Sequence, residues 1–343
     1  MIGGRESDRR VRLAHGGGGR LMRELVRDVF GRTFGDGGGP RVLEDAALLE
    51  TGGAGRLAFT TDTFVVTPLF FPGGNVGDLA VNGTVNDLAM RGARPLALSV
   101  AVVIEEGFAW DDLEAIAGSM ARAARSAGVA VVTGDTKVVP RGAADGIFVN
   151  TAGVGIVPEG RDVSAGNLGP GDRVLVSGPV GDHGVAVMSR RAGLSFEADV
   201  ESDTAALNGL VESMFAASAG IRAMRDPTRG GLAAALSEMA EDSRVAVLLD
   251  ERVLPVRPVV RAACETLGLD PLHVPCEGRL VAIVAAAEAD AVLEAMRGHE
   301  LGRGAVAIGE VREGPAGRVE LRTRVGGLRL VDLPAGELLP RIC

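Results

Sequence analysis

The chain has 343 residues, of which 46% are hydrophobic and 24% are charged, and its formal net charge is −9 at pH 7. The length and apolar content predict a globular protein of two domains. The acidic balance, with no lysine- or arginine-rich run, excludes the classes that bind nucleic acid or anionic membranes. There is no long apolar run or signal-peptide core, and the three cysteines fit neither a disulfide framework nor a zinc ribbon, so we expect a cytoplasmic protein.

A glycine run precedes the first predicted helix, which covers residues 21–30 because its apolar residues fall on one face. The run contains Gly16, Gly17, Gly18 and Gly19. Bare backbone N–H groups and the positive end of a helix dipole suit a phosphate. No Gly-Lys-Ser/Thr sequence follows, so this is no Walker A loop, and by itself the run favours a phosphate site only weakly.

Acidic residues recur at the ends of the next predicted strands. Residues 57–62 and 129–135 read as strands that end in Asp62 and Asp135, and we expect the remaining acidic and amide candidates, Asp45, Asn86 and Asp87, in strand ends or adjoining turns. Each aspartate alone is typical of a cap or turn, but the set supplies the hard oxygen ligands that Mg²⁺ prefers beside nucleotide phosphates. Lys137 is either a cation for a phosphate or a solvated lysine at a strand end.

The rest of the chain divides into segments of different character. An alternating strand over residues 146–157 precedes a stretch dense in glycine and proline, after which a strand restarts. Later helices are predicted over residues 231–241, 256–267 and 288–297. The predicted organisation is an N-terminal domain 1–157, a linker 158–172, a C-terminal domain 173–330 and a mobile tail 331–343.

The chain ends in Pro340-Arg341-Ile342-Cys343, which places a thiol on the last residue. The preceding prolines and glycine indicate a mobile tail. A tethered thiolate is a carrier or a nucleophile. A frayed end with an incidental cysteine fits the tail equally well.

Several segments together carry a resemblance to a known family. Residues 87–95 match the D-x4-G-A-x-P motif of the aminoimidazole ribonucleotide synthetase-like superfamily. Over nearly the whole chain, the sequence resembles the HypE family of hydrogenase maturation proteins, chiefly in residues 70–75, 83–90, 132–139, 226–232 and 340–343. The resemblance implies an α/β (α+β) two-domain fold, with an N-terminal ATP-binding domain that forms a barrel in a homodimer and an α+β C-terminal domain.

The resemblance also implies an activity, that of a carbamoyl dehydratase. A HypF-type carbamoyltransferase would load the sulfur of Cys343, and the tail would carry the S-carboxamide to a site that holds ATP and Mg²⁺. ATP-dependent dehydration would leave a thiocyanate. The cyano group would then pass to a HypC–HypD-type iron carrier complex as a cyanide ligand of [NiFe]-hydrogenase.

Roles for single residues follow from this resemblance. Mg²⁺ would be held by some of Asp45, Asp62, Asp87 and Asp226, while Lys137 would stabilise charge on the transferred group. Gly230 opens a helix that would face phosphate, although Asp226 to Gly231 is an equally good capping sequence.

Glu277 is the predicted base, because a glutamate in a partly desolvated turn has raised basicity. His15 or His183 is the alternative base. Cys276 stands where we expect asparagine in close relatives, and either packs inertly or exchanges with Cys343 under oxidation.

Two other functions stay open from the sequence. One is a selenophosphate synthetase or thiamine phosphate kinase, which needs no C-terminal thiol. The other is a non-enzymatic carrier that presents Cys343 to a metal-insertion complex. Substitution of Glu277 or Lys137 would abolish cyanide synthesis in an enzyme and leave a scaffold unaffected.

Overall fold

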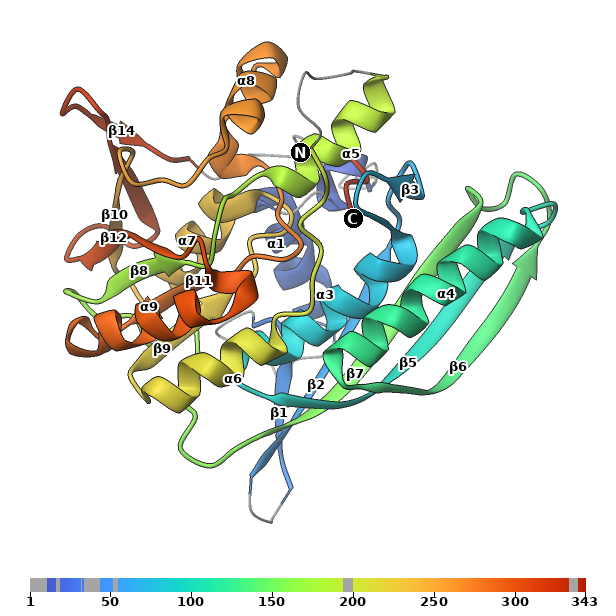
Figure 1. Cartoon of the computed structure of the whole chain (residues 1–343), viewed down its shortest axis with the longest axis horizontal. Helices are drawn as coiled ribbons and strands as arrows, with labels where there is room; N and C mark the ends of the chain where they lie inside the picture. The colour runs from blue at the N-terminus through green and yellow to red at the C-terminus, as the bar shows by residue number, and fades with distance from the viewer. Residues whose placement is uncertain are drawn as a thin grey trace, which may run out of the picture.

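The computed structural model describes residues 11–16, 19–31, 33, 44–51, 55–193, 200–332 and 339–343. Gly17 and Gly18 of the predicted phosphate loop lie outside these ranges. The described chain forms a five-stranded and a seven-stranded sheet, each with helices packed on it (Figure 1). Within these ranges no helix is long and apolar enough to cross a membrane.

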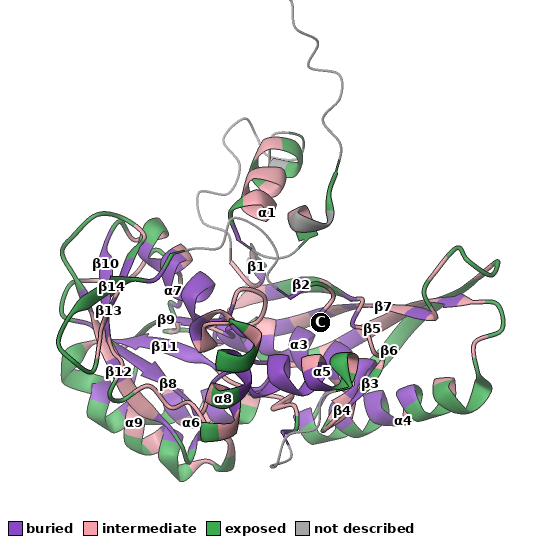
Figure 2. Ribbon diagram, turned by 90° about the horizontal axis from the view of Figure 1, so that it is seen from above, coloured by how far each residue is buried: buried purple, intermediate pink, exposed green. Residues whose placement is uncertain are grey.

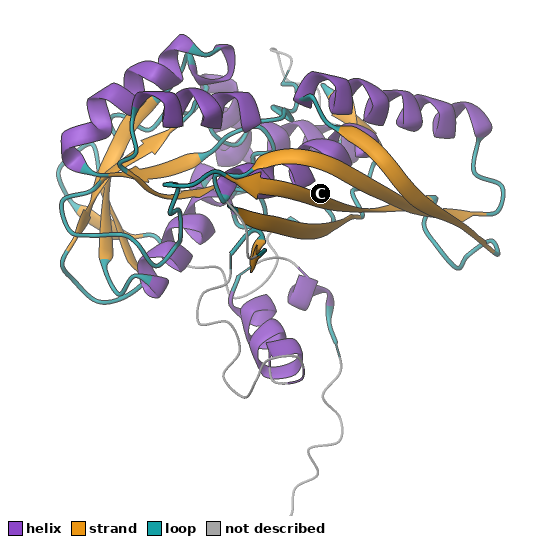
Figure 3. Cartoon of the chain, turned by 90° about the horizontal axis from the view of Figure 1, so that it is seen from below, coloured by secondary structure: helices purple, strands orange, loops and turns teal. Residues whose placement is uncertain are grey.

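The N-terminal sheet has the strand order β1-β2-β7-β5-β6. Its strands are β1 Ala47–Glu50, β2 Arg56–Phe64, β7 Ile147–Val157, β5 Arg94–Glu105 and β6 Ala130–Val139. Only β5 and β6 pair in parallel. Helices α3 (Val76–Met90) and α4 (Trp110–Ala127) cover one face, and the short strands β3 (Phe70–Phe71) and β4 (Gly74–Asn75) precede α3 (Figure 3).

The predicted placement of the aspartates at strand ends and turns is wrong for three of them. Strand β2 continues past Asp62, which pairs with Thr151 of β7, and β6 continues past Asp135. Strands β2 and β6 continue because their neighbours, β7 and β5, keep pairing with them beyond the apolar run from which the strand end was predicted. Asp87 lies in α3, a nearly all-buried helix that begins at a capping box formed by Asn75 and Asp78.

The C-terminal sheet has the order β14-β13-β10-β12-β8-β11-β9. Its strands are β8 Arg173–Val176, β9 Ile221–Arg225, β10 Ala246–Asp250, β11 Val281–Val284, β12 Val306–Arg312, β13 Arg318–Arg322 and β14 Leu328–Leu330. Side chains on β8 alternate between two cores: Val174 packs with α7 (Gly231–Asp242), whereas Leu175 packs with α6 (Asn208–Ala217) and α9 (Ala289–Gly298). Helices therefore cover both faces of this sheet.

The remaining elements join the two sheets or precede them. They are the 3₁₀ helices η1 Leu13–Gly16, η3 Pro271–His273, η4 Ala286–Glu288 and η5 Glu300–Gly302, the π-helix η2 Val26–Gly31, and the α-helices α1 Arg20–Leu25, α5 Asp182–Ala192 and α8 Pro258–Leu267. The predicted helix over 21–30 is thus an α-helical turn that continues as a π-helix.

The C-terminus lies inside the protein, next to α5 and β3 (Figure 1). Leu339, Ile342 and Cys343 belong to the same apolar core as α3 and α4. Figure 2 shows the terminus in the midst of buried segments. The predicted alternative of a frayed end is therefore wrong for residues 339–343. The hydrogen bonds that hold them come from residues far away in the sequence.

Candidate active site

Three carboxylates from different parts of the chain converge on one point. Asp45 precedes β1, Asp87 lies on α3 and Asp226 follows β9, and one ligand oxygen of each lies within 4.8 Å of the others. Thr60 on β2 donates its hydroxyl to Asp87 Oδ2 at 2.8 Å. Arg225 donates to Asp45 Oδ1 at 2.9 Å. The cluster thus joins the N-terminal half of the chain to the C-terminal half.

The clustered carboxyls are reluctant to ionise together. Burial, followed by repulsion from Asp45, raises the pKa of Asp226 to about 8. Burial also raises the pKa of Asp45 to about 6, against the attraction of Arg225. The pKa of Asp87 is raised well above its usual range by burial and by the charges of Asp226, Asp62 and Asp45. A divalent cation would remove this repulsion, so the donor set fits Mg²⁺ in charge and in chemistry.

Asp62 lies near this cluster but is not one of its three carboxylates. Burial raises its pKa, and the Arg229 guanidinium lowers it. Its negative charge also raises the pKa of Asp87 and of Glu277. Asp62 therefore lies near both the acidic cluster and Glu277.

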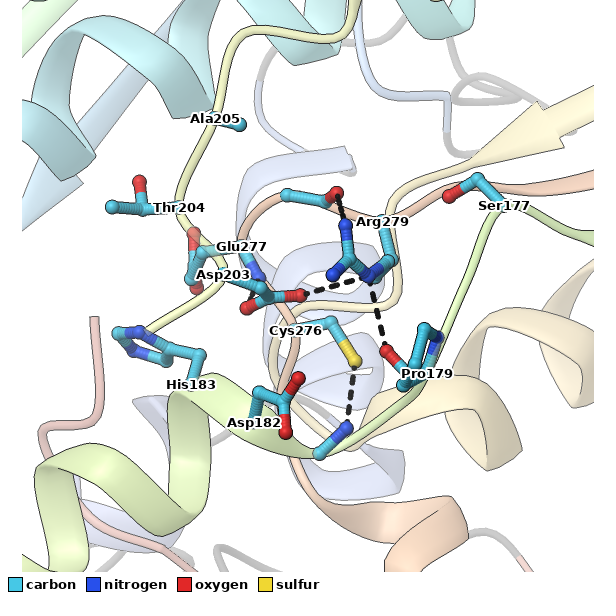
Figure 4. Close-up of polar contacts among 12 residues, drawn as sticks. Ser177, Pro179, Asp182, His183, Asp203, Thr204, Ala205, Cys276, Glu277 and Arg279 are labelled. Atoms are coloured by element: carbon cyan, nitrogen blue, oxygen red, sulfur yellow. Dashed lines mark hydrogen bonds and ion pairs between the residues drawn. The ribbon is translucent and has the colours of Figure 1, made fainter. Parts of the chain in front are cut away.

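The loop that carries Glu277 is held by the buried side chain of Asp203 (Figure 4). The Glu277 N–H donates to Asp203 Oδ1 at 3.1 Å, and Arg279 lies 3.7 Å from Asp203 Oδ2. Gly278 lets the segment through Asp203 cross closely, since a Cβ at Gly278 would lie 1.7 Å from the Asp203 carbonyl oxygen. The backbone next to the predicted base is thus rigidly placed.

The predicted base and the predicted carrier thiol lie together. Cys343 is 8% exposed, and its thiol lies close enough to the Glu277 carboxyl for that group to raise the pKa of the thiol. Burial raises the pKa of the thiol above its usual range, and the charges of Glu277 and Asp62 raise it further. Burial, with the charges of Asp226, Asp203 and Asp62, raises the pKa of Glu277 well above its usual value. Glu277 is 2% exposed, so both groups are shielded from bulk water.

The two alternative bases have other partners. His183 is buried and its Nε2 donates to the Ile342 carbonyl at 2.9 Å, so Nδ1 accepts from Ser202 Oγ at 2.8 Å. Burial lowers the pKa of His183 to about 4. His15 Nδ1 lies 2.9 Å from the Arg12 backbone N. His183 thus holds the tail, and His15 bonds within its own turn.

The described glycines of the predicted phosphate site approach the acidic motif. Arg229 donates to the Gly16 carbonyl at 3.2 Å. Gly19 is the N-cap of α1 and Gly230 the N-cap of α7, each with positive φ, 92° and 83°. The short glycine run and the Asp226–Gly231 segment therefore meet across the site.

Asn86 is brought to the same region, but its amide is used by the backbone. Its Nδ2 donates to the Ala205 carbonyl at 3.0 Å and to the Glu277 carbonyl at 3.3 Å. Its Oδ1 accepts from the Leu207 N–H at 2.8 Å. The side chain thus ties α3 to the loop of the predicted base.

Asp135 and Lys137 are not brought to this cluster within the described part of one chain. They lie on the edge strand β6, where Lys137 Nζ bonds to Asp135 Oδ2 at 2.6 Å. Their side chains are 63% and 66% exposed. The predicted role of Lys137 therefore stays a prediction.

Cys276 packs in the interior, beside Glu277 in the sequence. Its Sγ accepts the Gly181 N–H at 3.1 Å, as Figure 4 shows, and the residue is fully buried. Burial raises its pKa well above the usual value. Of the two predicted possibilities, inert packing fits these contacts.

Sequence reasoning missed several residues of this site. Thr60, Asp203 and Arg229 were not proposed, and His183 was considered only as a base. Arg229 lies inside the recognised segment 226–232, so its charge beside an aspartate was a usable signal. Asp203 has no local signal, because its partners Glu277 and Arg279 lie more than 70 residues away.

Comparison with known proteins agrees with this architecture. Residues 43–157 match the family model of the AIR synthase related protein N-terminal domain, and residues 169–322 match that of its C-terminal domain. Carbamoyl dehydratase HypE of Bradyrhizobium diazoefficiens is 56% identical over 334 residues, which cover 97% of this chain and 96% of the relative. The chain therefore belongs to the AIR synthase related proteins and, among them, to the HypE family.

Solved structures of the family share the fold. A crystal structure of a HypE–HypF complex contains a chain that is 48% identical, with a TM-score of 0.85 over 92% of this chain and 100% of that one. A HypE in complex with ATP is 46% identical, with a TM-score of 0.82 over 97% and 100% of the two chains.

Proposed function

We propose that this chain is a cytoplasmic carbamoyl dehydratase of hydrogenase maturation, which converts a carbamoyl group on the sulfur of Cys343 into a thiocyanate. The observation that carries the proposal is the terminal thiol buried against the Glu277 carboxyl, with Asp62 close to both. Kinases of the wider superfamily have no use for a thiol at this place. Membership of the HypE family, whose relatives are named carbamoyl dehydratase, supports the same activity.

The reaction breaks the carbon–oxygen bond of the carbamoyl group, its two N–H bonds and the bond from the γ-phosphoryl group to ADP; one of the two protons ends on the phosphate and the other is released. The carbamoyl carbon–oxygen bond breaks, and the nitrogen loses both protons to become a nitrile nitrogen. ATP supplies the phosphoryl group that lets the oxygen leave as phosphate instead of hydroxide. The products are a thiocyanate on Cys343, ADP and phosphate.

Glu277 is the residue that takes a proton from the carbamoyl nitrogen. Its raised pKa makes its carboxylate a stronger base than an exposed glutamate. The charges of Asp226 and Asp62 contribute to that increase, so a cation bound nearby would lower the pKa of Glu277 again. Burial of Glu277 keeps water from competing for the reacting group.

Mg²⁺ would be held by Asp45, Asp87 and Asp226, whose oxygens already converge. Asp62 is the fourth candidate ligand. The glycine-capped start of α7 at Gly230 suits a phosphate oxygen, as does the run that includes Gly16 and Gly19. These groups position a nucleotide, which is the main task in phosphoryl transfer.

The working form is a homodimer joined through the N-terminal sheet. Apolar side chains stand exposed on β2, β5, β6 and β7; they are Phe59, Leu96, Val131, Val132, Val138 and Ile156. The uncovered edge of β6 also offers unpaired backbone groups. A second copy would close this sheet into a barrel, and the predicted role of Lys137 requires that copy, because one chain does not bring Lys137 to the thiol.

A HypF-type carbamoyltransferase loads Cys343, and a HypC–HypD-type iron complex accepts the cyano group. A crystal structure of a HypE–HypF complex, in which the HypE chain is 48% identical, supports the first partner. The second is what the resemblance to the HypE family implies.

The test follows the C-terminal peptide by mass. The full chain is incubated with a HypF-type transferase and carbamoyl phosphate, with and without MgATP. We expect a carbamoyl adduct on Cys343 that loses one water only when MgATP is present. An unmodified peptide, with the transferase active on another acceptor, would refute the proposal.

A further inference from the structure

The terminal segment, residues 339–343, is held by backbone hydrogen bonds to the residues that follow β2. The Val65 N–H donates to a main-chain carboxylate oxygen of Cys343 at 3.2 Å, and the Thr67 N–H donates to the Arg341 carbonyl at 3.1 Å. Arg341 has a φ of 51°, in the left-handed region, and its Nε donates to the Val65 carbonyl at 2.8 Å. Backbone bonds on alternate residues thus hold the tail beside the end of β2.

The side chain of Arg191 bonds both to the terminal segment and to the backbone on which that segment lies, residues 65–67, here called the dock. Arg191, in the last turn of α5, donates through Nε and Nη2 to the Thr67 carbonyl at 2.9 and 2.5 Å. Its Nη1 donates to the Pro340 carbonyl at 2.7 Å, and its Nη2 to the Arg341 carbonyl at 2.8 Å. A planar guanidinium can meet three carbonyls at once, which the single ammonium of lysine reproduces poorly.

The docked state is unsuitable for loading. Cys343 is 8% exposed in it and packs in the apolar core of the N-terminal half. A carbamoyltransferase can reach the sulfur only after residues 339–343 leave the dock. If only the released state is loaded, the apparent affinity for the transferase is proportional to the fraction of chains with a released tail.

We propose that Arg191 is the positioning residue that sets the balance between the docked and the released tail, and thereby divides the cycle into loading and dehydration. The inference rests on the proposed function, because it assigns the two states to its two half-reactions. Arg191 bonds to the carbonyls of Pro340 and Arg341, two and three residues before the thiol. Its effect on the reaction passes through the backbone of Pro340 and Arg341.

Removal of Arg191 should therefore act in opposite directions on the two half-reactions. The released fraction rises, so that carbamoyl loading becomes faster. Dehydration of an already loaded chain becomes slower, because the carbamoyl group spends less time beside Glu277. A residue that only stabilised the fold would slow both.

The experiment measures the exposure of Cys343 in the full chain, without transferase or ATP. Arg191→Ala, Arg191→Lys and the matched control Arg190→Ala, an exposed neighbour on α5, are each treated with a maleimide, and the C-terminal peptide is followed by mass. We expect labelling of Cys343 to be about tenfold to a hundredfold faster in Arg191→Ala, from the loss of charge-assisted bonds. Arg191→Lys should fall between Arg191→Ala and the wild type, and Arg190→Ala should match the wild type.

Buried Cys264 and Cys276 report the fold in the same samples. If they label quickly in Arg191→Ala, the variant has unfolded and Arg191→Lys decides the matter. Equal labelling of Cys343 in the folded Arg191 variant and in Arg190→Ala would overturn the proposal. Labelling needs no carbamoyl chemistry, so failure of the wild type to dehydrate its carbamoyl group would count against the proposed function and not against the tail contact.

Discussion

The Cys343 thiol and the Glu277 carboxyl, 66 positions apart in the chain, lie near each other in the protein interior. This places the carrier atom of the last residue against a carboxyl whose pKa is raised by burial and by neighbouring acids. A carbamoyl group on the sulfur would therefore present its nitrogen or oxygen to a strong base shielded from water. In the proposed function, dehydration takes place at this pair.

Glu277→Gln should stop the reaction after loading. Glutamine keeps the shape of the side chain but cannot take a proton, and loss of a general base lowers rates by about 10²- to 10⁴-fold. The carbamoyl adduct should accumulate on Cys343 and lose water slowly when MgATP is added. The mass of the C-terminal peptide over time measures this, with Glu265→Gln on the exposed face of α8 as the control. Dehydration of the Glu277 variant at the wild-type rate would remove this residue from the reaction.

Asp87→Asn should be more stable than the wild type without metal and should lose that advantage when Mg²⁺ is added. Without metal, at pH 8, asparagine removes the cost of burying a carboxyl whose pKa is raised by burial and by three neighbouring acids, so the variant should be more stable by about 1–2 kcal/mol. With Mg²⁺ the wild type gains more, because a ligand that binds only the folded chain stabilises it by mass action.

Urea unfolding in EDTA and in Mg²⁺ measures the free energies of unfolding of the wild type and the variant under both conditions. Asp112→Asn on the exposed first turn of α4 is the control and should show no such change. A wild type that gains no stability from Mg²⁺ would exclude the three carboxylates as a metal site.

His183 should make the chain less stable in acid. Its pKa is lowered to about 4 by burial, below the 6.5 of an exposed histidine, so between these values the unfolded chain binds more protons than the folded one. The free energy of unfolding should therefore fall as the pH falls from about 6.5 to about 4, by about 2 kcal/mol at pH 5.

Comparison with His183→Gln isolates this contribution, because the other acids titrate in both proteins. The stability advantage of the wild type over the variant, measured by urea unfolding, should shrink steadily from pH 7 to pH 5. Parallel curves would mean that His183 does not titrate as its burial implies.

The sequence was most informative where a residue and its partners lie in one motif. The helix start after Gly230 could be predicted from its glycine pair and the apolar run that follows, although no side chain caps the helix, and the place of Asp226 in the site came from the family resemblance. Helix α7 agrees with the prediction within one residue, since its apolar positions repeat with the helical period. Local pattern is sufficient in these places.

The tail contacts could not be predicted in this way. His183 bonds to Ile342 across 159 positions, and Arg191 bonds to Arg341 across 150. Nothing near either residue in the sequence marks it as a partner of the C-terminus. Likewise, the apolar run before Asp62 suggested a strand end, but the pairing with β7, which sets the real end, is also non-local.

Val132→Asp should separate the proposed homodimer. Val132 is 66% exposed on the edge strand β6, within the face that a second copy would cover, and a buried unpaired carboxylate there would cost several kcal/mol. Light scattering after gel filtration should give a dimer for the wild type and a monomer for the variant. Val325→Asp, at a valine 95% exposed next to β14, makes the same chemical change elsewhere and should remain dimeric. If the Val132 variant keeps the wild-type mass, the interface lies on another face, and the predicted role of Lys137 loses the route by which a second chain would supply it.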